Sequence, residues 1–171
     1  KIEARKLELN PSYFNLTAFL QEIVEIFKIR AEQKEIQFIY QVVNQVPDGI
    51  HADPKRLRQI LVNLLGNAIK FTDRGGVTFK VGSLTSETPG SAPVKIRFQV
   101  EDTGLGIAPE ELDRIFLPFE QVGDRDRHAE GTGLGLAITQ RIVSMMEGEI
   151  KVESVLNEGS KFWIDLEASV A

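Results

Sequence analysis

Cysteine is absent from this chain of 171 residues, and histidine occurs only twice. Without cysteine there is no disulfide framework, no thiolate zinc site and no cysteine nucleophile, and the composition fits a reducing compartment. Two histidines leave little material for a histidine-rich metal site. The fold must therefore depend on an ordinary hydrophobic core, and any chemistry must come from other side chains.

Long apolar runs and an excess of basic charge are also missing. No apolar stretch approaches the roughly 18 residues that a membrane-spanning helix requires, and the charged first ten residues do not form a signal peptide. Lysine and arginine number 20 against 25 acidic residues, a net charge of −5, which argues against a broad nucleic-acid surface. We expect a globular domain without a nucleic-acid partner and without a membrane contact of its own.

Apolar residues recur at helical spacing in some segments and at strand spacing in others. Steps of three and four predict a long helix from about Asn15, capped by Asn15 or Thr17, and a second helix that Asp53 caps with proline next to it. Further helices are expected at 109–116 and 134–146, and strands at 13–16, 36–43, 77–81, 94–100, 150–154 and 161–166. This mixture predicts an α+β fold, a two-layer α/β sandwich with a mixed, mostly antiparallel sheet covered on one face by helices.

The helix that follows Asp53 carries a polar row beside its apolar stripe. Asn63, Asn67 and Lys70 are spaced at i, i+4 and i+7 and so lie on one side of the helix. An amide oxygen can ligate a hard cation such as Mg²⁺, and a lysine can neutralise phosphate. The alternative is the solvated face of an ordinary surface helix, and the row alone does not decide between the two.

Two glycine-rich turns occur in the second half of the chain. Residues 102–107 (DTGLGI) come directly after a strand, where glycine lets the backbone approach a ligand and Asp102 can accept a hydrogen bond from an amine such as that of adenine. Residues 131–136 (GTGLGL) precede a helix whose N-terminus can hold an anion. Alone, the first turn is as compatible with a tight turn capped by its aspartate, and the second with close packing of a helix on the sheet. The second turn matches neither a P-loop nor a dinucleotide fingerprint.

Taken in order, these segments resemble the motif boxes of sensor histidine kinases. The matches are residues 58–72 (RQILVNLLGNAIKFT) for the N box, 102–107 for the G1 box, 116–119 (FLPF) for the F box, 131–138 (GTGLGLAI) for the G2 box and 150–162 for the closing segment. The resemblance covers the chain from Tyr13 onward and implies the Bergerat, or GHKL, ATP-binding fold. One departure, Met-Met-Glu-Gly at 145–148 in place of a common Met-His-Gly-Gly, falls at a helix end.

The resemblance also implies a role for each matching residue. Asn67 matches the Mg²⁺ ligand, Asn63 lies beside it near the phosphates, and Lys70 faces the phosphates; these three carry the catalysis. Phe71 matches an aromatic position beside the nucleotide, and Asp102 matches the aspartate that reads the adenine amine. The other positions implied to contact ATP are Gly104, Gly106, Ile107, Phe119, Gly131, Thr132, Gly133, Leu134 and Gly135.

The activity that the resemblance implies is phosphoryl transfer rather than hydrolysis. Hydrolysing relatives place a glutamate general base where this chain has Asn63, and an amide cannot accept that proton. The γ-phosphoryl of Mg²⁺–ATP is expected to go to a histidine on a dimerisation domain outside this chain, because neither His51, in an expected turn, nor His128, in an expected lid, has the context of an acceptor. The alternatives are a nucleotide-sensing or scaffolding module without catalysis and a self-contained GHKL ATPase.

A longer protein that includes this chain is expected from its first residues. Residues 1–12 resemble the end of a dimerisation helix with its linker, residues 13–171 form the catalytic domain, and the chain begins without methionine. The full protein is expected to be a homodimer, with a response-regulator receiver domain as its indirect partner. The isolated domain is expected to be a monomer in the cytoplasm, as part of a sensor that can be membrane-bound.

Overall fold

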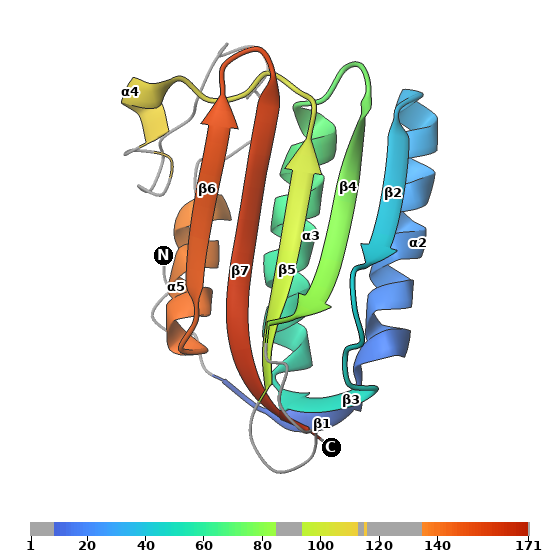
Figure 1. Cartoon of the computed structure of the whole chain (residues 1–171), viewed down its shortest axis with the longest axis vertical. Helices are drawn as coiled ribbons and strands as arrows, with labels where there is room; N and C mark the ends of the chain where they lie inside the picture. Colours follow the sequence, from blue (N-terminus) through green and yellow to red (C-terminus); the bar gives the residue numbers. More distant parts are fainter. Residues whose placement is uncertain (1–8, 85–93, 113–114, 116–134, 171) are drawn as a thin grey trace.

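The described residues form one sheet with helices on one of its faces (Figure 1). The structure, a computed structural model, describes residues 9–84, 94–112, 115 and 135–170. Helices α2 (Leu16–Lys34), α3 (Pro54–Lys70) and α5 (Gly135–Met145) lie side by side behind the sheet, and the short α4 (Pro109–Leu112) lies at one end of it. The two-layer α/β sandwich predicted from the sequence is confirmed.

The described residues form a seven-stranded sheet in which β7 is the central strand. The strands are β1 (Ser12–Asn15), β2 (Gln37–Val42), β3 (Gly49–Ala52), β4 (Gly76–Ser83), β5 (Val94–Asp102), β6 (Glu149–Val155) and β7 (Gly159–Val170). Strand β7 pairs with β5 on one side, with β6 on the other, and with β3 at its end. Only the β2–β4 pair is parallel among these pairings, so the predicted mixed and mostly antiparallel sheet is confirmed.

Local capping signals determine where the two long helices begin. Asn15 Oδ1 accepts a hydrogen bond from Ala18 N at 2.7 Å, so Asn15 rather than Thr17 caps α2. Asp53 Oδ1 accepts from Arg56 N at 3.1 Å, and its Oδ2 accepts from Asn10 N at 2.6 Å. Asp53 therefore caps α3 as predicted and also ties the chain before β1 to this helix.

The core lies between the helices and the sheet. Alternate residues of β4 and β5 are buried against the helices: Val77, Phe79, Val81, Ile96, Phe98 and Val100. The intervening residues form ion pairs on the helix-free face, where Arg97 makes two hydrogen bonds to Asp165 (2.8 and 3.0 Å) and Lys80 pairs with Glu101 (3.1 Å). This separation leaves the helix side of the sheet apolar and its opposite face solvated.

Strand β3 was not predicted from the sequence. His51 was expected in a turn, but it lies in β3 opposite Tyr13 of β1, with the two ring centroids 4.5 Å apart. The physical reason is pairing with strands far away in the sequence, which a local pattern does not show. The first strand was predicted at 13–16, but it ends at Asn15. Asn15 caps α2, and Leu16 is already the first residue of that helix.

Some predicted features lie outside the described residues. They are the first eight residues of the expected dimerisation-helix segment, the F box at 116–119, the expected lid with His128, and the start of the G2 box at 131–134. Within the described ranges, no helix is both long enough and apolar enough to cross a membrane.

Candidate functional site

The polar row of α3 contacts α5 through its first residue, Asn63. Asn63 donates from Nδ2 to the hydroxyl oxygen of Thr139 on α5 at 2.9 Å, and Thr139 has no exposed surface. Because the amide nitrogen faces Thr139, the amide oxygen lies on the other side of the carboxamide group. Asn67 and Lys70 follow along the same side of α3, so the predicted clustering of these three residues on one helix side is observed.

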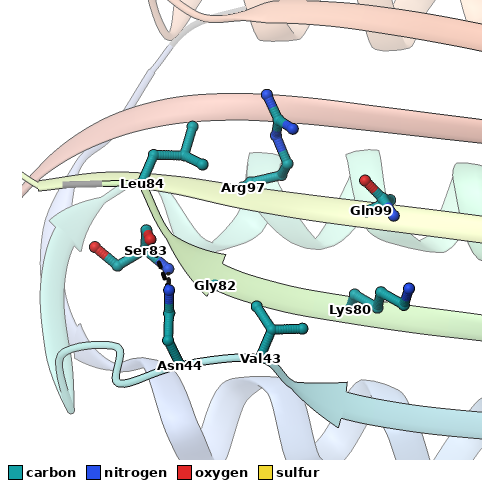
Figure 2. A pocket seen from close by; sticks show the side chains of 8 residues that line it. All are labelled: Val43, Asn44, Lys80, Gly82, Ser83, Leu84, Arg97 and Gln99. Carbon is teal, nitrogen blue, oxygen red and sulfur yellow. Dashed lines mark hydrogen bonds between the residues drawn. The ribbon is translucent and has the colours of Figure 1, made fainter. Parts of the chain in front are cut away.

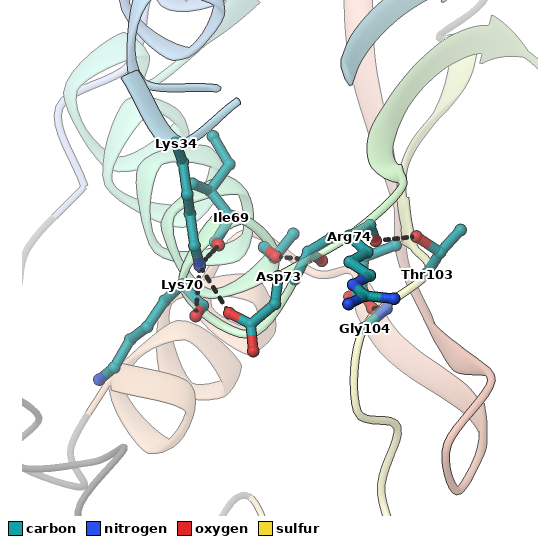
Figure 3. Close-up of polar contacts among 10 residues, drawn as sticks. Lys34, Ile69, Lys70, Asp73, Arg74, Thr103 and Gly104 are labelled. Carbon is teal, nitrogen blue, oxygen red and sulfur yellow. Dashed lines mark hydrogen bonds and ion pairs between the residues drawn. The ribbon is translucent and has the colours of Figure 1, made fainter. Parts of the chain in front are cut away.

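The C-terminal end of α3 is held by a lysine from α2 (Figure 3). Lys34 Nζ donates to the carbonyl oxygens of Ile69 (2.6 Å) and Lys70 (2.9 Å), and it lies 3.6 Å from Asp73 Oδ1. These carbonyls belong to the last turn, which lacks intrahelical donors, and a cation there also complements the helix dipole. The Lys70 side chain points away from this cluster in Figure 3, and its Nζ lies 5.3 Å from the centre of the Phe71 ring.

Asp102, the last residue of β5, accepts two backbone hydrogen bonds through one oxygen. Oδ1 receives Gly104 N at 2.9 Å and Ser160 N at 3.3 Å. Burial raises the pKa of Asp102 above its usual value, and the two backbone hydrogen bonds oppose this rise. From the described part of the chain, Oδ2 receives no hydrogen bond, so the carboxylate keeps one oxygen that can accept a donor from a ligand.

The loop after Asp102 is packed tightly between two other segments. Leu105 N donates to Phe71 O at 3.3 Å, and a Cβ added to Gly104 would clash with that same carbonyl oxygen. Gly106 has a φ of +72°, and a Cβ there would clash with the carbonyl oxygen of Val155. Both glycines are therefore required by close packing.

A hydrogen-bond chain through Ser154 fixes the far end of this loop. Ser154 Oγ accepts from Ile107 N at 2.7 Å and donates to Gly159 O at 2.9 Å, and it lies 2.8 Å from Ser160 Oγ. Ser160 also supplies the second N–H to Asp102, so the turn between β6 and β7 holds both the carboxylate and the loop.

The structure brings part of the predicted site together. Phe71, at the end of α3, contacts the Asp102 loop through Gly104 and Leu105, so the polar row and the adenine-type aspartate belong to one region. Gly135 begins α5, which contacts the row through Thr139. Five predicted residues lie outside the described part of the chain: Phe119, Gly131, Thr132, Gly133 and Leu134.

Sequence reasoning assigned no function to Lys34 or Thr139. Each contacts the site from another helix, 35 and 76 residues away from its partner in the sequence. A lysine in the last turn of α2 and a threonine within an apolar helix carry no motif. Their contacts with α3 can be recognised only in the folded structure, where the three helices pack side by side.

The donor set suits a nucleotide with a hard cation better than a metal bound by protein alone. Within the described ranges, no group of three or more histidine, aspartate or glutamate residues is placed to hold a metal ion. Magnesium in nucleotide sites takes one or two protein oxygens and completes its shell with phosphate and water. The amide oxygens of Asn63 and Asn67 fit that requirement.

A separate hollow of about 240 Å³ lies on the helix-free face of the sheet (Figure 2). It is lined by Val43, Asn44, Lys80, Gly82, Ser83, Leu84, Arg97 and Gln99. Its two cations are already paired with Glu101 and Asp165. The hollow shares no residue with the polar row or the Asp102 loop, and its neutralised charges do not favour a phosphate ligand.

The fold and site define a nucleotide-binding domain, and comparison with known proteins assigns its family. Residues 52–170 match the model described as Histidine kinase-, DNA gyrase B-, and HSP90-like ATPase. Since this match covers more than half of the chain, the chain belongs to this ATPase family.

Several sensor kinases match along almost the whole chain. Sensor protein GacS of Pseudomonas syringae pv. syringae is 41% identical over 167 residues, which are 97% of this chain and 18% of that protein. The aerobic respiration control sensor protein ArcB of Escherichia coli (strain K12) is 37% identical over 170 residues, 98% of this chain and 21% of that protein. The chain therefore spans roughly a fifth of the length of these relatives.

Solved structures give the same result for the fold. Full-length ShkA in complex with AMPPNP matches with a TM-score of 0.79 and 36% identity, over 96% of this chain and 32% of that one. The nucleotide-free catalytic domain of histidine kinase ThkA matches with a TM-score of 0.71 and 29% identity, over 95% of this chain and 97% of that one. The chain is homologous to the catalytic ATP-binding domains of sensor histidine kinases, and the predicted family is confirmed.

Proposed function

We propose that this chain binds Mg²⁺–ATP between the polar row of α3 and the Asp102 loop and donates the γ-phosphoryl group to a histidine outside the chain. The observation that carries the proposal is the meeting of these two segments at Phe71, whose carbonyl oxygen contacts Leu105 and Gly104. The AMPPNP complex of the similar protein ShkA and the family match support nucleotide binding.

Asp102 is the proposed reader of the base. Its Oδ1 is occupied by the N–H groups of Gly104 and Ser160, which fix the carboxylate plane and leave Oδ2 as the acceptor for a ligand. The exocyclic amine of adenine is a donor, whereas guanine carries a carbonyl oxygen at the same place. A carboxylate therefore favours adenine over guanine, because two acceptors repel one another.

The phosphates are proposed to lie along Asn63, Asn67 and Lys70. Asn67 would hold Mg²⁺ through its amide oxygen, with Asn63 beside it, and the bound ion would neutralise charge on the phosphate oxygens. The Lys70 ammonium forms no ion pair with the described residues and so can neutralise a phosphate directly. Phosphoryl transfer asks for little beyond such positioning and neutralisation.

Transfer is favoured over hydrolysis by the amide at Asn63. A carboxamide is not a general base, and its nitrogen is engaged by Thr139, so it does not activate water. The nucleophile is then a histidine on a dimerisation domain preceding residues 13–171, with residues 1–12 as the link. A receiver domain is the subsequent partner, and the domain acts in the cytoplasm within a homodimeric sensor.

Labelled ATP tests this proposal. A separately expressed dimerisation domain with its acceptor histidine is mixed with the chain and [γ-³²P]ATP, and we expect acid-labile phosphohistidine on that domain. Asn67→Ala should remove both Mg²⁺–ATP binding and transfer, whereas Gln99→Ala, an amide on the opposite face of the sheet, should change neither. Binding without transfer would favour a sensing or scaffolding module, and steady phosphate release by the chain alone would favour a self-contained ATPase.

A further inference from the structure

Thr139 has an unusual contact for a buried polar residue. The described residues contain three buried polar side chains, those of Asp53, Thr72 and Thr139. Asp53 accepts from Arg56 N and Asn10 N, and the Thr72 hydroxyl donates to Ala68 O at 2.7 Å, so the partners of both side chains are backbone groups. Thr139 instead contacts the side chain of Asn63, 76 residues earlier in the sequence.

The buried surroundings of Thr139 keep water away from this hydrogen bond. Ile142 and Val143 on the same helix are buried, and Thr139 itself has no exposed surface, so water does not substitute for a missing partner there. Because the Thr139 hydroxyl oxygen accepts from Nδ2, the nitrogen end of the carboxamide faces α5 in this structure. The amide oxygen is an acceptor and attracts a cation, whereas the amide nitrogen is a donor and attracts a phosphate oxygen. The orientation of the carboxamide therefore matters for a ligand.

We propose that Thr139 is a positioning residue for Asn63: it holds the amide nitrogen so that the amide oxygen is presented to the magnesium–triphosphate part of the nucleotide. This inference rests on the proposed function. Without the hydroxyl, the amide nitrogen loses this hydrogen bond, and the carboxamide is held less firmly in the orientation that presents its oxygen.

A purely structural role for Thr139, as a link between α3 and α5, makes a different prediction. Loosening the contact between the two helices would weaken nucleotide binding with and without Mg²⁺ alike. A positioning role affects only the part of the affinity that depends on Mg²⁺. The ratio of ATP affinities measured in Mg²⁺ and in excess EDTA therefore separates the two roles.

The test uses the near-isosteric Thr139→Val, with Thr139→Ser as the conservative variant that keeps the hydroxyl. Titration calorimetry on the whole chain gives the ATP affinity in both conditions. We expect Thr139→Val to lower the Mg²⁺/EDTA affinity ratio about 2- to 12-fold, the range of one hydrogen bond, and Thr139→Ser to keep the ratio of the wild type. An unchanged ratio in folded Thr139→Val, whether ATP affinity is kept or falls equally in Mg²⁺ and EDTA, would overturn this inference and leave the proposed function standing.

Failure of the proposed function gives a different result, since the wild-type chain would then bind ATP in neither condition, and the inference would fall with it. If Thr139→Val does not fold, NMR on the wild type decides. The side-chain amide protons of Asn63, assigned through Asn63→Ser, should exchange with solvent more slowly than those of Asn67. Equal exchange rates at the two amides would contradict a fixed Asn63.

Discussion

Asp102→Asn separates recognition of the base from the stability of the fold. Asparagine keeps an Oδ1 that can accept the N–H groups of Gly104 and Ser160, at 2.9 and 3.3 Å in the wild type. It replaces the other carboxylate oxygen by an NH₂ group, which is a donor. Facing the adenine amine, this group makes a donor–donor contact instead of a hydrogen bond.

The magnitude follows from the hydrogen bond that is lost. A bond to a charged group is worth about 1.5–3 kcal/mol, and about 1.4 kcal/mol corresponds to a factor of ten in affinity. ATP binding should therefore weaken about 10- to 150-fold in Asp102→Asn. The variant should be no less stable than the wild type at neutral pH, because the raised pKa of Asp102 means that burial disfavours its charged form.

Calorimetry with ATP and GTP, combined with urea unfolding followed by the single tryptophan, measures both effects. GTP should lose much less affinity than ATP, because the new NH₂ group can donate to the guanine carbonyl. Glu101→Gln is the matched control: it neutralises the preceding residue, whose carboxylate pairs with Lys80 outside the site. A folded Asp102→Asn that binds ATP as tightly as the wild type would refute the assignment of Asp102.

Three further predictions use other features of the fold. The pKa of Asp102 is raised, so ATP affinity should fall as acid protonates this carboxylate, and the fall should begin at a higher pH than for an ordinary aspartate. A pH titration of ATP binding measures this, and a pH profile identical to that of Asp102→Asn would contradict it. Gly104→Ala should cost about 1–3 kcal/mol in urea unfolding because its Cβ clashes with the Phe71 carbonyl. Glu35 and Glu147 adopt a left-handed backbone conformation, with φ of 64° and 61°. Glu35→Gly and Glu147→Gly should therefore each raise the free energy of unfolding by about 1 kcal/mol. Glu32→Gly, within α2, should lower it by a similar amount of about 1 kcal/mol.

Local chemistry made much of the fold predictable from the sequence. Asn15 and Asp53 cap helices through atoms three residues away, and the spacing of Asn63, Asn67 and Lys70 places them on one helix side. The resemblance to the motif boxes supplied the family, which single glycine turns did not.

Contacts between distant segments account for what the sequence did not predict. Strand β3 exists through pairing with β1 and with the end of β7. Thr139 and Lys34 reach the candidate site only when α2, α3 and α5 pack side by side. The glycines of the Asp102 loop could be explained from the sequence by close approach to a ligand. In the structure, Gly104 and Gly106 are required by contacts inside the protein.

Mapping of amide chemical shifts on addition of Mg²⁺–ATP tests the central claim most directly, because it reports on both faces of the sheet at once. The account predicts the largest shifts at Asn63, Asn67, Lys70 and the Asp102 loop. It predicts no comparable shifts around the hollow on the helix-free face, at Val43, Leu84 and Gln99. Shifts confined to that hollow, with none at Asp102 or Asn67, would contradict the account.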